Sequence, residues 1–569
     1  MFKNTKLVLV TILIVAFFLR IWQINKVPVA LFGDEVDLGY QAYSILKTGR
    51  DYYGNFMPIH FHSLAEWRTP LYLYSAVPTV ALFGISPLGV RLPAVIFGVL
   101  GVWALYLLVK ELFKREDLSL VAAAVITLSP WHLEYSRAGF EVTELLFFLI
   151  MGLYLFFRGL RQNKYLWMSA VCFALTPWVY STAKLFTPLL LLFLFFSYRK
   201  EIFKIPKKYL VYTIIAFIVV GAPIAYSTVF GGGSQRFDYI SVFSDPTTEP
   251  EIGTARGIDA KARGETGTGL NPTVIDKLIH NKFTFWGDHV LRNFYQPFSA
   301  DFLFNNGDPN PRHSIHQMGE LYKIEVIPLI VGLVLFFVSK HERRTKLLVV
   351  FWLLAGAIPA AITRDGGNHA TRLILILPPL VFLVSYGLVE GIKLIKEKRR
   401  NMAILGYVVI FVISFIFYQH NYWVHNPFDS ERWWHAGFSE AFQAVKSIDS
   451  NYDRVVISTR GEPPWVFFAG LYPYPPDLWQ KNFPIGNDVN LAGFGKVSHI
   501  DKFYFGSPEI GGVYDWGKVL DKKTLYLAAA KEVNVNLILE PDRTPKDITL
   551  LKAIAYPSGE PAFYLFTGK

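Results

Sequence analysis

The chain has 569 residues, of which 52% are hydrophobic and only 18% are charged. This composition excludes a disordered chain or an ordinary soluble protein and is typical of a polytopic membrane protein. The formal net charge is +11, but Lys and Arg gather in short loops between apolar runs, so membrane topology explains the charge better than nucleic-acid binding. Cys172 is the single cysteine, which excludes a disulfide framework and a cysteine-based zinc site.

Apolar runs predict about eleven membrane-spanning helices, each needing about 20 residues. The first run follows Lys3 and Lys6 and lacks a small-residue cleavage site, which indicates an uncleaved signal anchor. The segment 71–83 is apolar but short and begins after Pro70, so we expect an interfacial or re-entrant helix there. The predicted spans are 7–23, 90–113, 118–136, 140–158, 164–181, 184–198, 209–230, 324–339, 346–363, 370–394 and 402–420.

Basic residues follow every even-numbered span, which predicts the topology. By the positive-inside rule these loops face the cytoplasm, and the N-terminus lies on the same side. The odd-numbered exits then face outward in a multi-pass plasma-membrane protein. The outward segments are the loops 24–89 and 231–323 and the C-terminal tail.

The two largest outward segments differ in composition. Loop 231–323 is rich in turn-forming pairs, such as Asp308-Pro309 and Asn310-Pro311. We expect its part 245–270 to be mobile and its later aromatic residues, Phe283 among them, to pack on something. From residue 425 the composition becomes that of a soluble domain. We therefore predict a transmembrane domain, 1–424, and an extracytoplasmic α/β domain, 425–569. The latter is expected to contain a helix over Gly437–Ile448 and strands over Arg454–Thr459, Val535–Glu540 and Phe563–Thr567.

The stretch Leu31–Gly54 carries the strongest chemical signal. Asp34, Glu35 and Asp37 directly follow the first span. A charged carboxylate at this depth is energetically unfavourable unless water, a partner or a substrate stabilises it. Acids in the first turn of a helix are the alternative, since they favour the helix dipole. Their place at a membrane exit favours function, because a general base needs a carboxylate in a partly dry pocket facing its substrate.

Several motifs in order give this chain a family resemblance. It resembles the membrane glycosyltransferases of the GT-C fold, above all the group of protein O-mannosyltransferases and aminoarabinose transferases of lipid A. The similarity covers about residues 1–420 in order. The segments that carry it are 31–54, Trp67–Tyr74, Leu82–Gly84, Val90–Ala94, Ser129–Glu141, Phe298–Gly307 with Arg312 and His313, and His369–Arg372 before Pro378 and Pro379.

The resemblance implies transfer of a sugar from a polyprenyl-phosphate donor, with inversion, on the outer side of the membrane. The acceptor hydroxyl would belong to a protein, a glycan or a lipid, and no nucleotide cofactor is expected. Carried over by position, Asp34 would be the base that deprotonates the acceptor, and Glu35 its neighbour in the motif. Glu141 would be the second acid, binding sugar hydroxyls or supporting the acceptor.

Cationic side chains are needed where the lipid phosphate departs, because negative charge develops there. Interfacial snorkelling is the alternative for the arginines, and plain packing is the alternative for Lys184. Aminoarabinose transferases have a lysine where this chain has Thr69, with Arg68 one residue earlier. The candidates for binding substrate are Arg68, Arg91, Arg137, Arg364, His369, Arg372, Tyr53 and Lys184.

Two groups of histidines could hold a divalent metal. His60 and His62 lie two residues apart, so they share a face of an extended segment, and Glu66 follows closely. His313 with His316 forms a second pair. The alternative in both cases is a merely polar loop.

The segment Trp433–Gly437 shares its first two residues with the WWDYG motif of oligosaccharyltransferases but lacks the Asp and Tyr. A membrane-interface aromatic belt is the interpretation we favour for it. For the whole chain, the alternatives to a transferase are a flippase of lipid-linked sugars and a non-catalytic anchor with a binding tail. A flippase predicts paired, broken helices with charges near the midplane.

Overall fold

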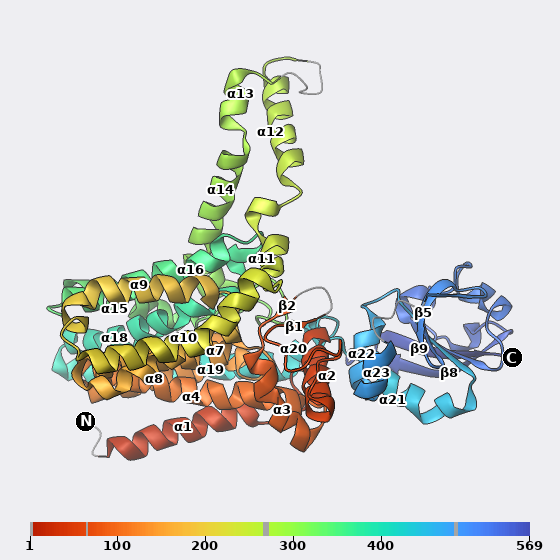
Figure 1. The fold of residues 1–569 in the computed structure, drawn as a ribbon, viewed down its shortest axis with the longest axis horizontal. Coiled ribbons are helices and arrows are strands. Elements are labelled where there is room, and N and C mark those ends of the chain that lie inside the picture. The colour runs from red at the N-terminus through yellow and green to blue at the C-terminus, as the bar shows by residue number, and fades with distance from the viewer. Residues whose placement is uncertain (1–3, 64–66, 266–271, 483–487) are drawn as a thin grey trace.

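The computed structural model describes residues 4–63, 67–265, 272–482 and 488–569. It consists of a long helical bundle and a C-terminal domain built on a β-sheet, placed at one end of the bundle (Figure 1). The N-terminus lies at the other end of the bundle. A helical hairpin projects sideways from the bundle, near the end that carries the C-terminal domain.

Helices lie at each of the eleven ranges predicted to span the membrane. Six of the described helical segments are long and apolar enough to cross a membrane, so the count of eleven crossings stays a prediction. The range 118–136 contains a break, because Pro130 starts a new short helix, α6 (Pro130–Tyr135). The other bundle helices are α1 (Thr5–Ile21), α4 (Pro87–Phe113), α5 (Glu116–Leu128), α7 (Val142–Arg161), α8 (Leu166–Val179), α9 (Ala183–Ile202), α10 (Lys207–Phe230), α15 (Val326–Val338), α16 (Arg343–Ala361), α17 (Ala370–Leu373), α18 (Leu377–Leu394) and α19 (Glu397–His420).

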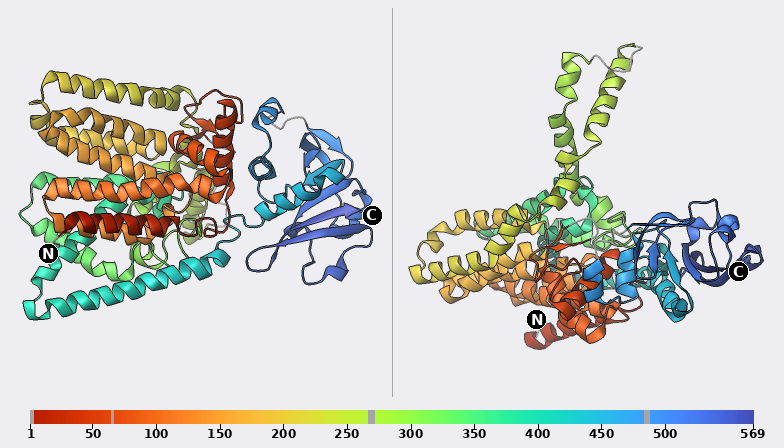
Figure 2. Two further views of the ribbon diagram at one scale, coloured as in Figure 1. Left: turned by 90° about the horizontal axis from the view of Figure 1, so that it is seen from below. Right: turned by 45° about the vertical axis from the view of Figure 1, so that its right-hand side comes forward.

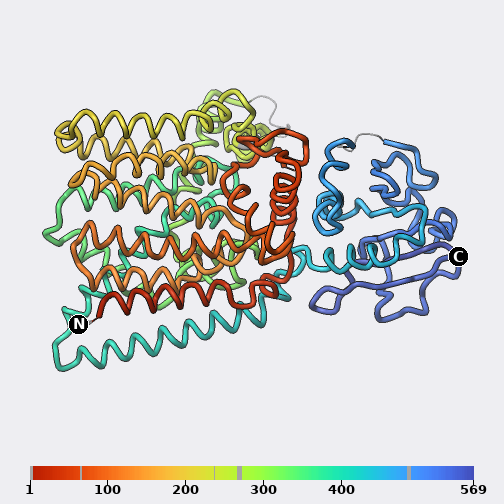
Figure 3. Tube along the Cα trace, turned by 60° about the horizontal axis from the view of Figure 1, so that its bottom comes forward, coloured from red at the N-terminus to blue at the C-terminus, as the bar shows by residue number. Residues whose placement is uncertain are grey.

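The basic connections between helices share one end of the bundle, the end opposite the C-terminal domain (Figure 3). Ion pairs link neighbouring connections there: Arg115 with Glu390, Arg161 with Glu111, and Arg344 with Glu201. Five loops that are far apart in the sequence therefore lie in one basic layer, as the positive-inside pattern predicts.

Helix α2 (Gly33–Thr48) lies across the opposite end of the bundle, between the bundle and the C-terminal domain (Figure 2). It packs on α3 (Leu71–Phe83) and on α22 (Pro464–Leu471) and α23 (Pro476–Asn482) of the C-terminal domain. One hydrophobic core therefore runs from α2 and α3 into this domain. Two short strands, β1 (Phe61–His62) and β2 (Trp67–Arg68), pair beside α2.

The C-terminal domain contains a seven-stranded sheet, in which β3 (Arg454–Ile457) runs parallel to its neighbours β6 (Phe503–Phe505) and β7 (Thr524–Ala529). The helix predicted over Gly437–Ile448 is present as α21 (Phe438–Ile448). The strand predicted over Val535–Glu540 is wrong, because the Asn536 side chain accepts the N–H groups of Ile538 and Leu539 and holds a turn. In sheet order the strands are β4 (Val489–Leu491), β5 (Gly495–Ile500), β6 (Phe503–Phe505), β3 (Arg454–Ile457), β7 (Thr524–Ala529), β9 (Pro561–Gly568) and β8 (Ile548–Ala555).

The projecting hairpin is formed by α12 (Thr248–Ala262), α13 (Val274–Ile279) and α14 (Lys282–Tyr295), and it follows the short helix α11 (Gln235–Ile240). The segment expected to be mobile, 245–270, is helical over α12, and its mobility stays a prediction. Residues 266–271 lie outside the described chain. The Arg256 guanidinium on α12 donates to the His280 carbonyl and joins the two arms. Phe283 was expected to pack, but its side chain is 80% exposed.

Candidate functional site

Asp34 lies in the first turn of α2 and is held by Arg68. Arg68 Nη2 is 2.6 Å from Asp34 Oδ1, and its Nη1 donates to the Asp34 carbonyl at 3.3 Å. The Asp34 side chain is 51% exposed, whereas Arg68 is buried. The carboxylate is therefore oriented from one side and open to solvent on the other.

Asp37, one turn further along α2, is buried behind this ion pair. It accepts hydrogen bonds from the Tyr52 hydroxyl at 2.6 Å and the Ser63 hydroxyl at 2.7 Å, and Arg68 Nε lies 3.8 Å away. Burial raises the pKa of the Asp37 carboxyl. These contacts tie the loop after α2 to the strand pair and support Arg68.

Glu35 points away from the solvent-facing side of α2. Its carboxylate binds Arg91 Nε and Nη2 at 2.7 and 2.8 Å and accepts the Gly139 N–H at 2.7 Å. Arg91 also donates to the carbonyls of Ile24, Pro28 and Ala30. Both side chains are completely buried, so this pair joins α2 to α4 and to the loop before α7.

Two further predicted residues lie near this ion pair. Glu141 is half-buried and directly precedes α7, two residues beyond the glycine that binds Glu35. Arg137 is buried and donates to four backbone carbonyls, including those of Trp22 and Val27, and to the Tyr422 hydroxyl. The Arg137 guanidinium therefore supports the turn after α1.

Lys184 and Arg372 line one mainly apolar cavity of about 340 Å³ between α9, α10, α11 and α16. The Lys184 ammonium lies 3.0 Å from the Gly233 carbonyl and 3.1 Å from His60 Nε2. Arg372 donates to Thr363 Oγ1 at 2.8 Å and forms an ion pair with the exposed Asp365 carboxylate. Arg364 lies beside this cavity, where its backbone N–H donates to the carbonyl of the lining residue Ile240. An apolar groove with two cations is suited to a lipid that carries a phosphate.

The histidines expected to form a first metal site have other partners. His60 binds the Ser227 hydroxyl through Nδ1, and burial and the nearby Lys184 lower its pKa to about 4. The His62 ring packs against Tyr53 and Trp67, with ring centroids 4.2 and 4.9 Å away. Glu66 lies outside the described residues.

Asp308, His313 and His369 form the group with metal-ligand geometry within the described part of the chain. One ligand atom from each lies within 4.8 Å of the others. Burial would raise the pKa of Asp308, but the hydrogen bond from His313 and the nearby His369 hold it below its usual value. Sequence reasoning selected His313 as a metal candidate and His369 as a substrate-binding candidate. It missed Asp308, whose Asp-Pro-Asn-Pro context was interpreted only as a turn.

The C-terminal domain contacts the start of α2 directly. His435 Nδ1 accepts the Gly33 N–H at 3.0 Å. Trp434 is buried, with its ring 5.3 Å from Phe32 and 5.4 Å from the Arg91 guanidinium. Trp434 thus covers the Glu35–Arg91 ion pair. The interpretation of the segment Trp433–Gly437 as a membrane-interface belt is therefore wrong for Trp434.

Comparisons with known proteins agree with this architecture. The family described as dolichyl-phosphate-mannose-protein mannosyltransferase matches residues 68–226. The putative mannosyltransferase YkcB of Bacillus subtilis is 26% identical over 174 residues, which is 30% of this chain and 23% of that protein. The chain therefore matches less than a quarter of this relative's length.

Two solved structures show the same arrangement of the chain. ArnT from Cupriavidus metallidurans, bound to undecaprenyl phosphate, superposes with a TM-score of 0.50 at 10% identity, over 98% of this chain and 97% of that one. The apo oligosaccharyltransferase of Archaeoglobus fulgidus has a TM-score of 0.50 at 12% identity, over 93% and 70%. The resemblance predicted from the sequence is thereby confirmed, and the chain has the fold of the GT-C membrane glycosyltransferases.

Proposed function

We propose that this protein is an integral membrane glycosyltransferase that transfers a sugar from a polyprenyl-phosphate donor to an acceptor hydroxyl, with inversion. The observation that carries the proposal is the half-exposed Asp34 carboxylate, oriented by Arg68 at the bundle end where a cationic, apolar cavity also lies. The strand pair β1–β2 connects the two, since Arg68 pairs with Phe61 and the adjacent His60 binds Lys184.

In this proposal Asp34 removes the proton from the acceptor hydroxyl while its oxygen attacks the anomeric carbon. The bond from that carbon to the phosphate oxygen breaks on the opposite face, so the configuration inverts. Lys184 and Arg372 bind the polyprenyl phosphate that leaves, because fixed cations stabilise the charge that develops on its oxygens. The apolar walls of the cavity hold the first part of the lipid chain.

The comparisons support this choice of donor. The matched family and relative are described as mannosyltransferases, and the ArnT structure contains undecaprenyl phosphate. Mannosyl-phosphoryl-undecaprenol is therefore the first donor to test. We further propose that the basic end of the bundle faces the cytoplasm and the C-terminal domain lies outside. A divalent metal would be held by Asp308, His313 and His369, whose oxygen and nitrogen donors suit it.

The test uses membranes that contain the protein, supplied with radiolabelled mannosyl-phosphoryl-undecaprenol, and follows label transferred to membrane or aqueous products. Asp34→Asn is expected to reduce transfer by about 10²–10⁴-fold, the range of a lost general base. Asp453→Asn is the matched control, since Asp453 is also an exposed, ion-paired carboxylate but lies in the C-terminal domain. Equal transfer by Asp34→Asn and wild type would exclude Asp34 as the base. Scrambling of labelled lipid without transfer would favour a flippase.

A further inference from the structure

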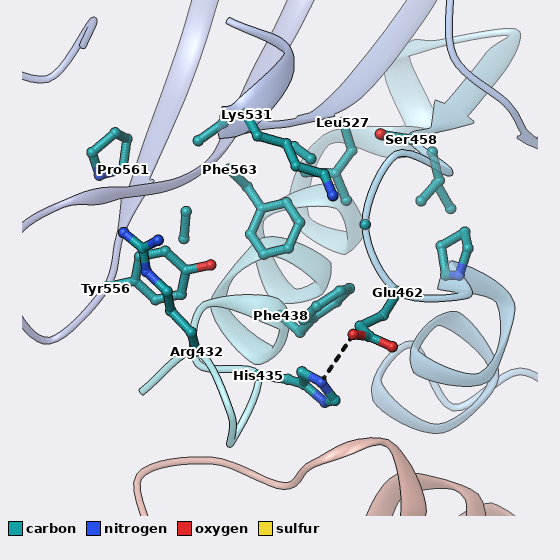
Figure 4. Close-up of a pocket in the computed structure, with 16 residues that line it drawn as sticks. Arg432, His435, Phe438, Ser458, Glu462, Leu527, Lys531, Tyr556, Pro561 and Phe563 are labelled. Atoms are coloured by element: carbon teal, nitrogen blue, oxygen red, sulfur yellow. Dashed lines mark ion pairs between the residues drawn. The ribbon is translucent and has the colours of Figure 1, made fainter. Parts of the chain in front are cut away.

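The C-terminal domain contains a cavity of its own, of about 520 Å³ (Figure 4). It opens beyond the carboxyl ends of the parallel strands β3 and β7, where Ser458 and Ala530 continue the chain. In sheets of this kind, ligands bind in the crevice outside the carboxyl ends of the strands. Nothing in the proposed donor site uses this cavity.

The floor of this cavity is aromatic and aliphatic. Phe438 and Phe563 are buried side chains of its lining, with ring centroids 4.6 Å apart, and Tyr556 adds a half-buried ring. Ligand pockets generally combine such apolar walls with a few placed polar groups. A saccharide ring, apolar on its faces and polar at its edge, matches this combination.

Charged groups surround the opening. Arg432 and Lys531 bring two cations, of which Arg432 pairs with the exposed Glu560 carboxylate at 2.9 Å. Glu462 brings a carboxylate 3.6 Å from His435 Nε2. The Lys531 side chain points into the cavity (Figure 4), and within the described ranges no carboxylate lies within 4.0 Å of its ammonium. The nearby His435, Arg312 and Lys531 side chains hold the pKa of Glu462 below its usual value. An ionised carboxylate can accept sugar hydroxyls, while the cations suit an acidic group.

We propose that this cavity binds the acceptor and that the acceptor is an acidic saccharide, one that carries phosphate or carboxylate groups. The proposal rests on the proposed transferase function. Its link to that function is His435, which lines the cavity through its ring and accepts the N–H of Gly33, the residue before Asp34. An acceptor held here by one sugar unit lies at the start of the helix that carries the base.

The test measures binding to the full-length protein in nanodiscs by isothermal titration calorimetry. The probes are oligogalacturonate, mannose 6-phosphate and neutral maltohexaose, and they distinguish carboxylate-bearing, phosphate-bearing and uncharged saccharides. We expect Lys531→Met to weaken binding of an acidic probe about tenfold, the usual effect of losing one charge-assisted hydrogen bond. Lys523→Met is the matched control, because Lys523 is an exposed lysine just before the opposite end of β7.

Each result decides the proposal. Binding of an acidic probe that Lys531→Met weakens and Lys523→Met preserves supports the acceptor site. Equal binding by Lys531→Met, equal binding of maltohexaose, or no binding of any probe overturns it. The outcome is separate from the transfer assay. Probe binding without Asp34-dependent transfer would support a saccharide-binding site and exclude the proposed transferase. Asp34-dependent transfer without probe binding would support the transferase and exclude the binding site.

A second inference concerns the projecting hairpin, whose helices α13 and α14 expose many apolar side chains. On α14, Phe283 and Leu291 lie on one face, while Asp288 and Arg292 lie on another. An exposed apolar surface of this extent marks an interaction site. The exposed apolar residues of this hairpin surface are Val274, Ile275, Leu278, Ile279, Phe283, Leu291 and Tyr295.

The arrangement of the hairpin indicates what covers this surface. It extends sideways across the direction of the bundle helices, near the end that carries α2, and would therefore run along a membrane surface (Figures 1 and 2). The apolar α13 and α14 lie on the side of the bundle, whereas the polar α12 lies on the side of the C-terminal domain. We infer that the hairpin surface inserts into the headgroup region of the lipid bilayer, as amphipathic interfacial helices do.

The test places a fluorescent label on a cysteine at residue 279 or 254, in a chain carrying Cys172→Ala, in nanodiscs. Ile279 belongs to the hairpin surface and exposed Thr254 lies on α12, so the second position is the matched control. We expect brominated lipids to quench the label at Ile279→Cys and to leave the label at Thr254→Cys unquenched. Equal quenching at both positions, or none at 279, would overturn the inference, as would burial of the label in a dimer of this chain.

Discussion

Glu35 provides the sharpest test of the site, because its position in the motif and its surroundings assign it different roles. The substitution Glu35→Gln keeps the shape of the side chain but removes its charge. Arg91 would then remain completely buried and charged, with only backbone carbonyls as strong partners. Removal of one partner of a buried ion pair destabilises a protein by about 3–5 kcal/mol. We expect a loss of this size.

The same loss should depend on Arg91. Removing both charges, in Glu35→Gln with Arg91→Met, leaves no unpaired charge, so the double variant is expected to lose less stability than the two single variants together. Glu116→Gln is the control: this carboxylate pairs with Lys110 in a half-exposed ion pair, worth about 0–1 kcal/mol. The measurement is thermal unfolding in detergent, followed by tryptophan fluorescence, with transfer assayed well below the transition.

The refuting result is specific. If Glu35→Gln unfolds at the wild-type temperature and yet transfers no sugar, Glu35 takes part in the chemistry and the assignment of a structural role is wrong. If it unfolds early but is active when folded, the ion pair is a support for Asp34.

Three further predictions concern the donor cavity and the metal group. Because the pKa of His60 in the folded protein is about 4, His60 takes up a proton between pH 6.5 and 4 in the unfolded chain but not in the folded one. Stability should therefore fall as the pH drops through this window, and His60→Asn should flatten the fall in thermal unfolding; parallel curves would contradict this. Lys184→Met should weaken binding of undecaprenyl phosphate about tenfold, whereas Asp34→Asn should bind it normally; equal binding by Lys184→Met would remove this lysine from the donor site. The purified protein should carry about one equivalent of divalent metal by mass spectrometry, and His313→Ala should lose it; equal metal content in both would exclude the group.

The sequence predicted the helices of the bundle well, because a membrane-spanning helix must be apolar over its whole length wherever it lies. It also selected Lys184 and Arg372 as substrate-binding candidates. They lie 188 positions apart, and the structure brings them to one cavity. The alternation of spans puts both residues near the same end of the bundle, so the predicted topology alone limits which cations can lie in the same site.

The partners of charged residues were not predictable in the same way. Glu35 meets Arg91 at a separation of 56 residues, and Gly33 meets His435 at a separation of 402. Hydrophobic periodicity describes which face of a helix is buried, but it contains no information about which distant side chain lies opposite. For the same reason Asp308 was interpreted as part of a turn, although its carboxylate faces two histidines.

These contacts also change how the C-terminal domain should be understood. The Tyr40 hydroxyl of α2 donates to the Tyr474 carbonyl, and Gln480 of α23 binds Ser44 and the Asp51 carbonyl at the far end of α2. His435 binds the start of the same helix. Both ends of α2 are therefore bonded to this domain, and its apolar face is shared with the domain's core. Since α2 carries Asp34, the C-terminal domain fixes the position of the proposed base as directly as the membrane bundle does.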